Sequence, residues 1–262
     1  MTGAPGGSAH GDALAEAARI ALRCLDLTSL NDADTPADID RLCARAQGRC
    51  GEVAAVCVWP RFAAQVRQRL PASIRVAAVA NFPAGGTDLA AAVADVHAIA
   101  EAGAQEVDVV LPWRALLAGD AAVAGNLLHA VRAACDGLTL KVILETGELR
   151  TPEAIARAAR LALDAGADFL KTSSGKVPVG ATLPAAETLL QTLRGHPQVG
   201  LKLSGGLRRV TDLLPYLALL QRERGAQALR PALFRIGASG LLDDIESVLG
   251  DGPAAVAPTQ GY

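Results

Sequence analysis

Short apolar and β-branched segments alternate with amphipathic Ala-, Leu- and Arg-rich segments along the whole chain, and this alternation constrains the fold more than any other feature. Strands and helices that alternate in this way are typical of a parallel sheet covered by helices. Eight such units in 262 residues predict a single (β/α)8 barrel, a fold that takes about 250 residues. The predicted strands are 24–28, 54–58, 75–81, 106–111, 140–145, 168–172, 200–204 and 234–237.

A doubly wound open sheet is the alternative arrangement for the same alternation of elements. Such sheets usually carry a glycine-rich loop after the first strand. Here the first strand runs into Leu25-Asp26-Leu27-Thr28-Ser29-Leu30, which contains no glycine. The barrel is therefore the favoured fold, as one domain over 1–262.

Capping residues set the expected helix boundaries. Helix starts are indicated where a threonine precedes a proline, and glycines before strands indicate helix ends. A leading helix is expected from about Asp12 and a last one over Leu241–Leu249, so that the core spans about 12–250. We expect 1–11 and 251–262 to be mobile tails. The start and end signals are Thr35-Pro36, Thr151-Pro152, Thr182-Leu183-Pro184, Gly103 and Gly166.

The charge and hydropathy pattern exclude several functional classes. The formal net charge is −2 without a basic block, which argues against a nucleic-acid partner or a polybasic membrane surface. Apolar runs are too short to span a membrane, and the start of the chain does not resemble a signal peptide, so a cytoplasmic protein is expected. The five cysteines show no Cys-x-x-Cys spacing, and the four histidines form no metal-binding or triad pattern.

Lysine is rare, and all of it lies in one part of the sequence. Only four of the 25 basic residues are lysine, and they fall between positions 141 and 202, in or just after predicted strands. Arginine evidently serves wherever a generic positive charge suffices. A lysine amine can lose its proton and attack a carbonyl to form a Schiff base, which a guanidinium cannot do. The lysines are Lys141, Lys171, Lys176 and Lys202.

Lys171 and Lys202 lie in neighbouring predicted strands, and Asp108 lies among valines in an earlier one. Two lysines that face the barrel interior would be desolvated and would repel each other, which lowers the pKa of one of them. The alternative for each lysine is a stem that extends to the barrel rim, and for Asp108 a salt bridge to a buried arginine. Asp26 and Glu145 are further strand carboxylates, either partners of Lys141 or contacts for substrate hydroxyls.

Glycine-rich loops late in the chain favour an anion site. Glycines allow backbone N–H groups to approach a phosphate, and barrel enzymes often bind phosphate after strands seven and eight. The alternative is that these glycines simply form tight turns. The loops are Ser174-Gly175-Lys176, Ser204-Gly205-Gly206 and Gly237-Ala238-Ser239-Gly240.

Over residues 20–250 the chain resembles the deoxyribose-phosphate aldolases, a class I aldolase family. The resemblance rests on Leu25-Asp26-Leu27-Thr28 with Asn31-Asp32, on 56–62 (VCVWPRF), on Asn81-Phe82-Pro83, and on 106–110 (EVDVV), 140–149 (LKVILETGEL), 168–176 (DFLKTSSGK), 202–206 (KLSGG) and 234–239 (FRIGAS). A terminal tyrosine, Tyr262, also resembles one branch of the family.

The resemblance implies reversible cleavage of 2-deoxy-D-ribose 5-phosphate to glyceraldehyde 3-phosphate and acetaldehyde, with no metal and no organic cofactor. Lys171 matches the Schiff-base lysine, and Asp108 and Lys202 match a proton-relay pair. Phosphosugar and aldehyde substrates are the expected partners, and a homodimer is one possible assembly. The expected substrate-binding residues are Gly175, Lys176, Gly205, Gly206, Gly237, Ser239, Cys57, Thr172 and Tyr262.

The chain departs from the family pattern at a few positions. Leu203 and Ser204 stand where proline or alanine often follows the strand-seven lysine, Ser174 stands where threonine is common, and Gly240 replaces a frequent second serine. Three rival functions remain: a class I aldolase for another phosphosugar, a phosphosugar-binding barrel without catalysis, and a metal-dependent class II aldolase. The last is disfavoured because no histidine cluster exists.

Overall fold

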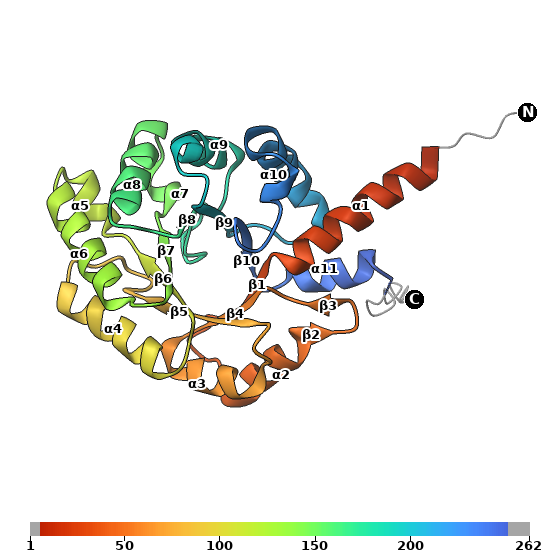
Figure 1. The fold of residues 1–262 in the computed structure, drawn as a ribbon, viewed down its shortest axis with the longest axis horizontal. Helices are drawn as coiled ribbons and strands as arrows, with labels where there is room; N and C mark the ends of the chain where they lie inside the picture. The colour runs from red at the N-terminus through yellow and green to blue at the C-terminus, as the bar shows by residue number, and fades with distance from the viewer. Residues whose placement is uncertain (1–5, 251–262) are drawn as a thin grey trace, which may run out of the picture.

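The computed structural model describes residues 6–250 and confirms the (β/α)8 barrel. Eight parallel strands close in the order β1-β10-β9-β8-β7-β6-β5-β4, and helices surround them as a ring (Figure 1). All eight predicted strands are present, each within two residues of its expected bounds. They are β1 (Leu25–Thr28), β4 (Ala55–Val58), β5 (Arg75–Ala80), β6 (Glu106–Val110), β7 (Thr139–Ile143), β8 (Phe169–Lys171), β9 (Gly200–Ser204) and β10 (Phe234–Ala238).

The helices begin where the capping signals indicated. Thr35, Thr151 and Thr182 are N-caps whose side chains accept a backbone N–H, and a proline follows in the first turn of each helix. The helices are α1 (Gly6–Arg23), α2 (Pro36–Arg45), α3 (Pro60–Arg69), α4 (Leu89–Glu101), α5 (Trp113–Leu117), α6 (Ala121–Ala134), α7 (Thr146–Leu149), α8 (Pro152–Asp164), α9 (Leu183–Thr192), α10 (Val210–Arg224) and α11 (Leu241–Val248).

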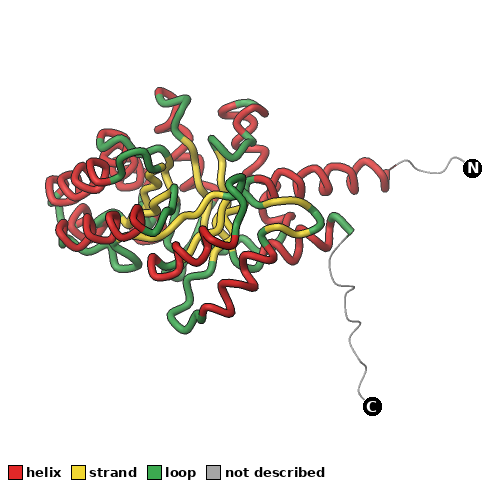
Figure 2. The backbone as a smooth tube through the Cα atoms, turned by 60° about the horizontal axis from the view of Figure 1, so that its bottom comes forward, coloured by secondary structure: helices red, strands yellow, loops and turns green. Residues whose placement is uncertain are grey.

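Two features differ from the expectation. Helix α1 starts at Gly6, before the expected Asp12, and extends outward from the barrel (Figure 2). A small antiparallel hairpin, β2 (Gln47–Gly48) and β3 (Gly51–Glu52), was not predicted, because strands of two residues carry no periodicity. Residues 1–5 and 251–262, including most of the expected tails and Tyr262, lie outside the described part.

The hydrophobic core lies between the strands and the surrounding helices. Outward-facing strand residues such as Val56, Val107, Leu140 and Leu201 are buried there against the helices. Inside the barrel, a second apolar cluster occupies only the side formed by β4 and β5, and it consists of Leu30, Cys57, Ala77 and Val79. The other interior side is therefore left for polar groups. No helix among residues 6–250 is long and apolar enough to cross a membrane.

Candidate active site

The interior of the barrel opposite the apolar cluster holds a group of buried charges from six strands. Strand register brings them together: Asp108 on β6 lies beside Lys141 on β7, and Lys171 on β8 lies beside Lys202 on β9. Lys202 in turn lies beside Arg235 on β10. Adjacent strands are about 4.8 Å apart, so side chains at equal height on the inner face must interact.

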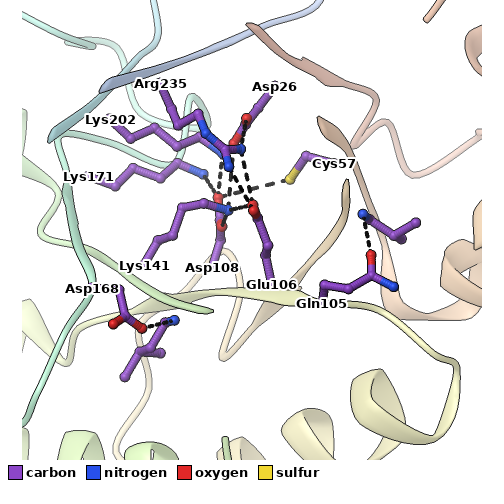
Figure 3. Close-up of polar contacts among 12 residues, drawn as sticks. Asp26, Cys57, Gln105, Glu106, Asp108, Lys141, Asp168, Lys171, Lys202 and Arg235 are labelled. Atoms are coloured by element: carbon purple, nitrogen blue, oxygen red, sulfur yellow. Dashed lines mark hydrogen bonds and ion pairs between the residues drawn. The ribbon is translucent and has the colours of Figure 1, made fainter. Parts of the chain in front are cut away.

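Asp108 is the centre of this group, as Figure 3 shows. Its Oδ2 accepts hydrogen bonds from the Nζ atoms of Lys171 and Lys202, each at 2.7 Å. Its Oδ1 accepts one from Lys141 Nζ, also at 2.7 Å. Asp108 is completely buried, and Lys171 is only 3% exposed. A buried carboxylate with three ammonium partners is satisfied, although each group lost its hydration on burial.

A second set of contacts, to Glu106 and Asp26, also holds the lysines in place. Lys141 Nζ lies 2.5 Å from Glu106 Oε2, and Lys202 Nζ lies 2.5 Å from Asp26 Oδ2. Arg235 joins these two acids, with nitrogen–oxygen distances of 2.7 Å to Asp26 and 2.8 Å to Glu106. Lys171 alone among the four cations contacts a single carboxylate among the described residues.

The charge balance of the cluster indicates which amine loses its proton most easily. Four basic groups face three acidic ones, so full ionisation would leave one buried positive charge in excess. The cluster becomes neutral when one base loses its proton. Lys171 has the fewest anionic contacts and lies nearest the cavity described below, so it is the base that loses a proton most easily. The members are Lys141, Lys171, Lys202, Arg235, Asp26, Glu106 and Asp108.

The pKa shifts follow the same balance. Burial lowers the pKa of Lys171, and repulsion by Lys202 lowers it further, so that attraction by Asp108 does not restore its usual value. Burial also disfavours the charged forms of Lys141 and Lys202, but their neighbouring carboxylates outweigh it and raise the pKa of both. Burial acts to raise the pKa of Asp108, yet the three lysines hold that pKa well below its ordinary value.

Two further predicted residues lie at the edge of this cluster. The Cys57 Sγ is 4.0 Å from Asp108 Oδ2, and burial raises the pKa of its thiol, so the sulfur is a neutral part of the inner wall. The Thr172 side chain is fully buried, and its Oγ1 donates to the Ser204 carbonyl at 3.2 Å and accepts from the Ser204 N–H at 3.0 Å. Thr172 therefore joins β8 to β9.

A cavity of about 510 Å³ opens above Lys171 at the carboxyl-terminal ends of the strands. Three predicted glycine-rich loops contribute to its wall, and Gly205 and Gly206 adopt positive φ values of 83° and 82°. Backbone of this kind suits glycine and can point successive N–H groups at one anion. The predicted residues on the wall are Gly175, Lys176, Gly205, Gly206, Gly237 and Ser239.

Lys176 connects two sides of this cavity. Its Nζ donates to the Leu30 carbonyl at 2.6 Å, from the loop after β8 to the loop after β1. Lys176 lies on the cavity wall, and the other three lysines lie in the buried cluster. All four lysines of the chain therefore belong to one region. The rarity of lysine in the sequence thus marked one site.

Sequence reasoning missed or left open several members of the site. Arg235 and Glu106 were not singled out, although both are charged residues inside predicted strands. Arg208 was also missed; it is exposed at the cavity wall. The alternative for Asp108, a salt bridge to a buried arginine, is wrong, because lysines surround Asp108 while Arg235 binds Asp26.

Of the two roles that the sequence left open for Glu145, that of a Lys141 partner is wrong, because the described carboxylates that pair with Lys141 are Asp26, Glu106 and Asp108. Contact with substrate hydroxyls stays a prediction. Glu145 adopts a left-handed backbone conformation with φ 59°, and its Oε1 accepts the Ser174 N–H at 3.0 Å. Burial raises the pKa of this carboxyl despite those hydrogen bonds. Glu145 thus holds the loop after β8, and Asp26 is the carboxylate that lies near Lys141, at 3.6 Å.

Comparisons with known proteins show which family the chain belongs to. A sequence 46% identical over 94% of this chain and 96% of its own length is a deoxyribose-phosphate aldolase of Agrobacterium fabrum (strain C58). A putative deoxyribose-phosphate aldolase from Toxoplasma gondii ME49 superposes with a TM-score of 0.85 at 26% identity, covering 93% of this chain and 98% of that one. A putative deoxyribose-phosphate aldolase from Coccidioides immitis superposes with a TM-score of 0.77 at 29% identity, covering 88% of this chain and 86% of that one. The sequence model of the DeoC/LacD family aldolases matches residues 20–243, and the chain belongs to that family.

Proposed function

We propose that this protein cleaves 2-deoxy-D-ribose 5-phosphate reversibly to D-glyceraldehyde 3-phosphate and acetaldehyde, through a Schiff base on Lys171. One observation carries the assignment of the lysine: Lys171 is the amine at the floor of the cavity, and it is the cluster base with the fewest carboxylate partners. Family membership and the Agrobacterium fabrum relative support the aldolase reaction and its substrate.

The chemistry needs Lys171 without its proton, and burial together with repulsion by Lys202 lowers the pKa of this amine. Lys171 Nζ attacks the C1 aldehyde of the open-chain sugar, and loss of water gives an iminium. Cleavage of the C2–C3 bond then transfers its electron pair to C2, where the iminium accepts it as an enamine. The C3 hydroxyl loses its proton and becomes the aldehyde of glyceraldehyde 3-phosphate. Protonation of C2 and hydrolysis of the imine release acetaldehyde and Lys171.

Asp108 and Lys202 are the proposed proton-relay pair, because Asp108 Oδ2 accepts hydrogen bonds from both Lys171 Nζ and Lys202 Nζ. Lys202 holds its proton firmly and Asp108 remains an anion, so the resting pair consists of one acid and one acceptor. Proton transfer by a positioned group contributes typically about 10²- to 10⁴-fold to a rate. Lys141 and Arg235 are not assigned to the proton relay. Their ion pairs are with the carboxylates of the cluster, which they hold in place.

The phosphate is proposed to lie against the loops after β9 and β10, with Lys176 nearby. Gly205 and Gly206 offer backbone N–H groups, and Ser239 lies just before α11, whose N-terminus favours an anion. Tyr262, the remaining expected substrate-binding residue, lies outside the described residues, and its role stays a prediction.

Turnover of 2-deoxyribose 5-phosphate, coupled to detection of glyceraldehyde 3-phosphate, tests the proposed function. We expect activity that a chelator does not reduce, together with enzyme inactivation by borohydride in the presence of substrate. Turnover only with another phosphosugar would favour a different class I aldolase. Binding without turnover would favour a non-catalytic phosphosugar-binding barrel, and loss of activity with a chelator a class II aldolase.

Gly240 provides a quantitative test of the phosphate site. It is the N-cap of α11, it lines the cavity, and a Cβ atom added there would have no neighbour within 4 Å. Gly240→Ser should therefore add a hydroxyl without strain and tighten binding of the 5-phosphate by roughly five- to tenfold. A charged hydrogen bond contributes about 1.5 kcal/mol at the low end, and the new hydroxyl gains somewhat less because it replaces a water molecule.

Two controls separate the hydroxyl from other effects of the Gly240→Ser change. Gly240→Ala adds the same Cβ without a hydroxyl, and it should leave the Kd of the phosphorylated sugar close to the wild-type value. Non-phosphorylated 2-deoxyribose should bind equally to all three proteins. Equal improvement for both sugars, or weaker binding of the phosphorylated one, would show that residue 240 does not face phosphate.

A homodimer and a cytoplasmic location form part of the same proposal. Cys24, Cys43, Cys57 and Cys135 form no disulfide bond, which fits a reducing compartment. A single symmetric interface is the commonest route to a homo-oligomer. Sedimentation of the purified protein distinguishes a monomer, a dimer and a larger assembly.

A further inference from the structure

Ser204, the last residue of β9, carries a buried hydroxyl for which the described residues provide no hydrogen-bond partner. The residue is only 4% exposed, yet it forms part of the cavity wall. Buried hydroxyls are normally paired, and an unpaired one costs free energy. An unpaired hydroxyl beside a substrate cavity is therefore available to pair with a polar group of the ligand.

The backbone around Ser204 holds this residue firmly in place. Its carbonyl accepts hydrogen bonds from Ser173 Oγ at 2.8 Å and from the Ala181 N–H at 2.9 Å, and its N–H donates to Thr172 Oγ1 at 3.0 Å. The neighbouring strand leaves room for the side chain, because a Cβ on Gly237 would lie only 2.8 Å from Ser204 Oγ. Every polar group of Ser204 except the hydroxyl is thus already bonded.

The position of Ser204 along the barrel axis indicates which part of the substrate lies beside its hydroxyl. Residues two apart on a strand share a face, so Ser204 lies one level above Lys202 on the same inner face. Gly205 and Gly206, at the proposed phosphate site, follow directly. C3 of the sugar reacts at the level of Lys202 and Lys171, and the C5 phosphate lies at the glycines. The group between these levels is C4, which carries a hydroxyl.

We propose that Ser204 hydrogen-bonds the C4 hydroxyl of the substrate and thereby favours 2-hydroxyaldehydes as acceptors in the condensation direction. This inference rests on the proposed function and adds a specificity-determining residue to it. Ser204 forms no bond to a reacting atom; it discriminates acceptors by pairing with a hydroxyl that unsubstituted aldehydes lack.

Condensation of acetaldehyde with four acceptor aldehydes tests the proposal. D-glyceraldehyde 3-phosphate carries both the hydroxyl and the phosphate, D-glyceraldehyde only the hydroxyl, 3-oxopropyl phosphate only the phosphate, and 3-hydroxypropanal neither. Ser204→Ala should lower kcat/KM about three- to tenfold for the two 2-hydroxyaldehydes and change it less than about twofold for the other two, as expected for one neutral hydrogen bond.

Ser173→Ala is the matched control, because it removes a buried serine hydroxyl that is bonded to the Ser204 carbonyl and does not line the cavity. Its effect should be the same for all four acceptors. Ser204→Ala leaves no protein group unpaired, so its free energy of unfolding should not fall, and urea denaturation checks this.

Two outcomes would overturn the inference without touching the proposed function. An equal loss for all four acceptors would place the Ser204 hydroxyl at the reacting oxygen or give it a purely structural role. A loss confined to the two phosphorylated acceptors would place it at the phosphate. Wild-type condensation with D-glyceraldehyde 3-phosphate reports on the proposed function by itself.

Discussion

Replacing Lys171 with arginine should abolish aldol cleavage and borohydride trapping together. Arginine keeps the positive charge near Asp108, but its guanidinium cannot form an imine. We expect kcat to fall by about 10⁴-fold or more, since enzymatic rate enhancements are typically at least ~10⁶ and this change removes the covalent path. Turnover of 2-deoxyribose 5-phosphate measures the loss.

Peptide mapping identifies the modified lysine in the same experiment. Reduction of the imine blocks tryptic cleavage after Lys171, so a peptide that runs from Leu161 to Lys176 should appear with the added mass of the fragment. Lys176→Arg, on the cavity wall but outside the buried cluster, should still be trapped. A Lys171→Arg protein with near wild-type turnover would refute the Schiff-base assignment.

Replacing Lys202 with methionine, which keeps an unbranched apolar stem, should have the second largest effect. Loss of a relay group lowers kcat by about 10²- to 10⁴-fold. The substitution also changes the charge balance: three bases then face three acids, and the cluster is neutral only when Lys171 is protonated. The pKa of Lys171 should therefore rise.

The pH profile separates the two effects of the Lys202 substitution. Imine formation needs neutral Lys171, so a raised pKa moves the acidic limb of borohydride trapping to higher pH. Breaking a buried charge network also costs about 3–5 kcal/mol of stability, which urea denaturation measures independently. An unmoved acidic limb in the folded variant would contradict the electrostatic role, and an unchanged kcat would contradict the relay.

Local features of the sequence predicted the barrel and indicated the lysine that we propose forms the Schiff base. Strand periodicity, threonine caps and helix-ending glycines are properties of short segments, so they predicted the elements within a few residues. The restriction of lysine to 141–202 marked Lys171 and Lys202, because arginine replaced lysine everywhere that its chemistry was not needed. Resemblance to the aldolases then supplied a substrate, which neither periodicity nor composition could.

Only the tertiary structure decided how the charges are paired. Arg235 is 209 positions from Asp26 and 129 from Glu106, and strand register inside a closed barrel is what brings them together. Three features depend on which side chains are buried next to one another. They are the lysine partners of Asp108, the lowered pKa of Lys171 and the unpaired hydroxyl of Ser204. Desolvation and ion pairing depend on the distances between segments that are far apart in the sequence. Those distances cannot be read from the order of the residues alone.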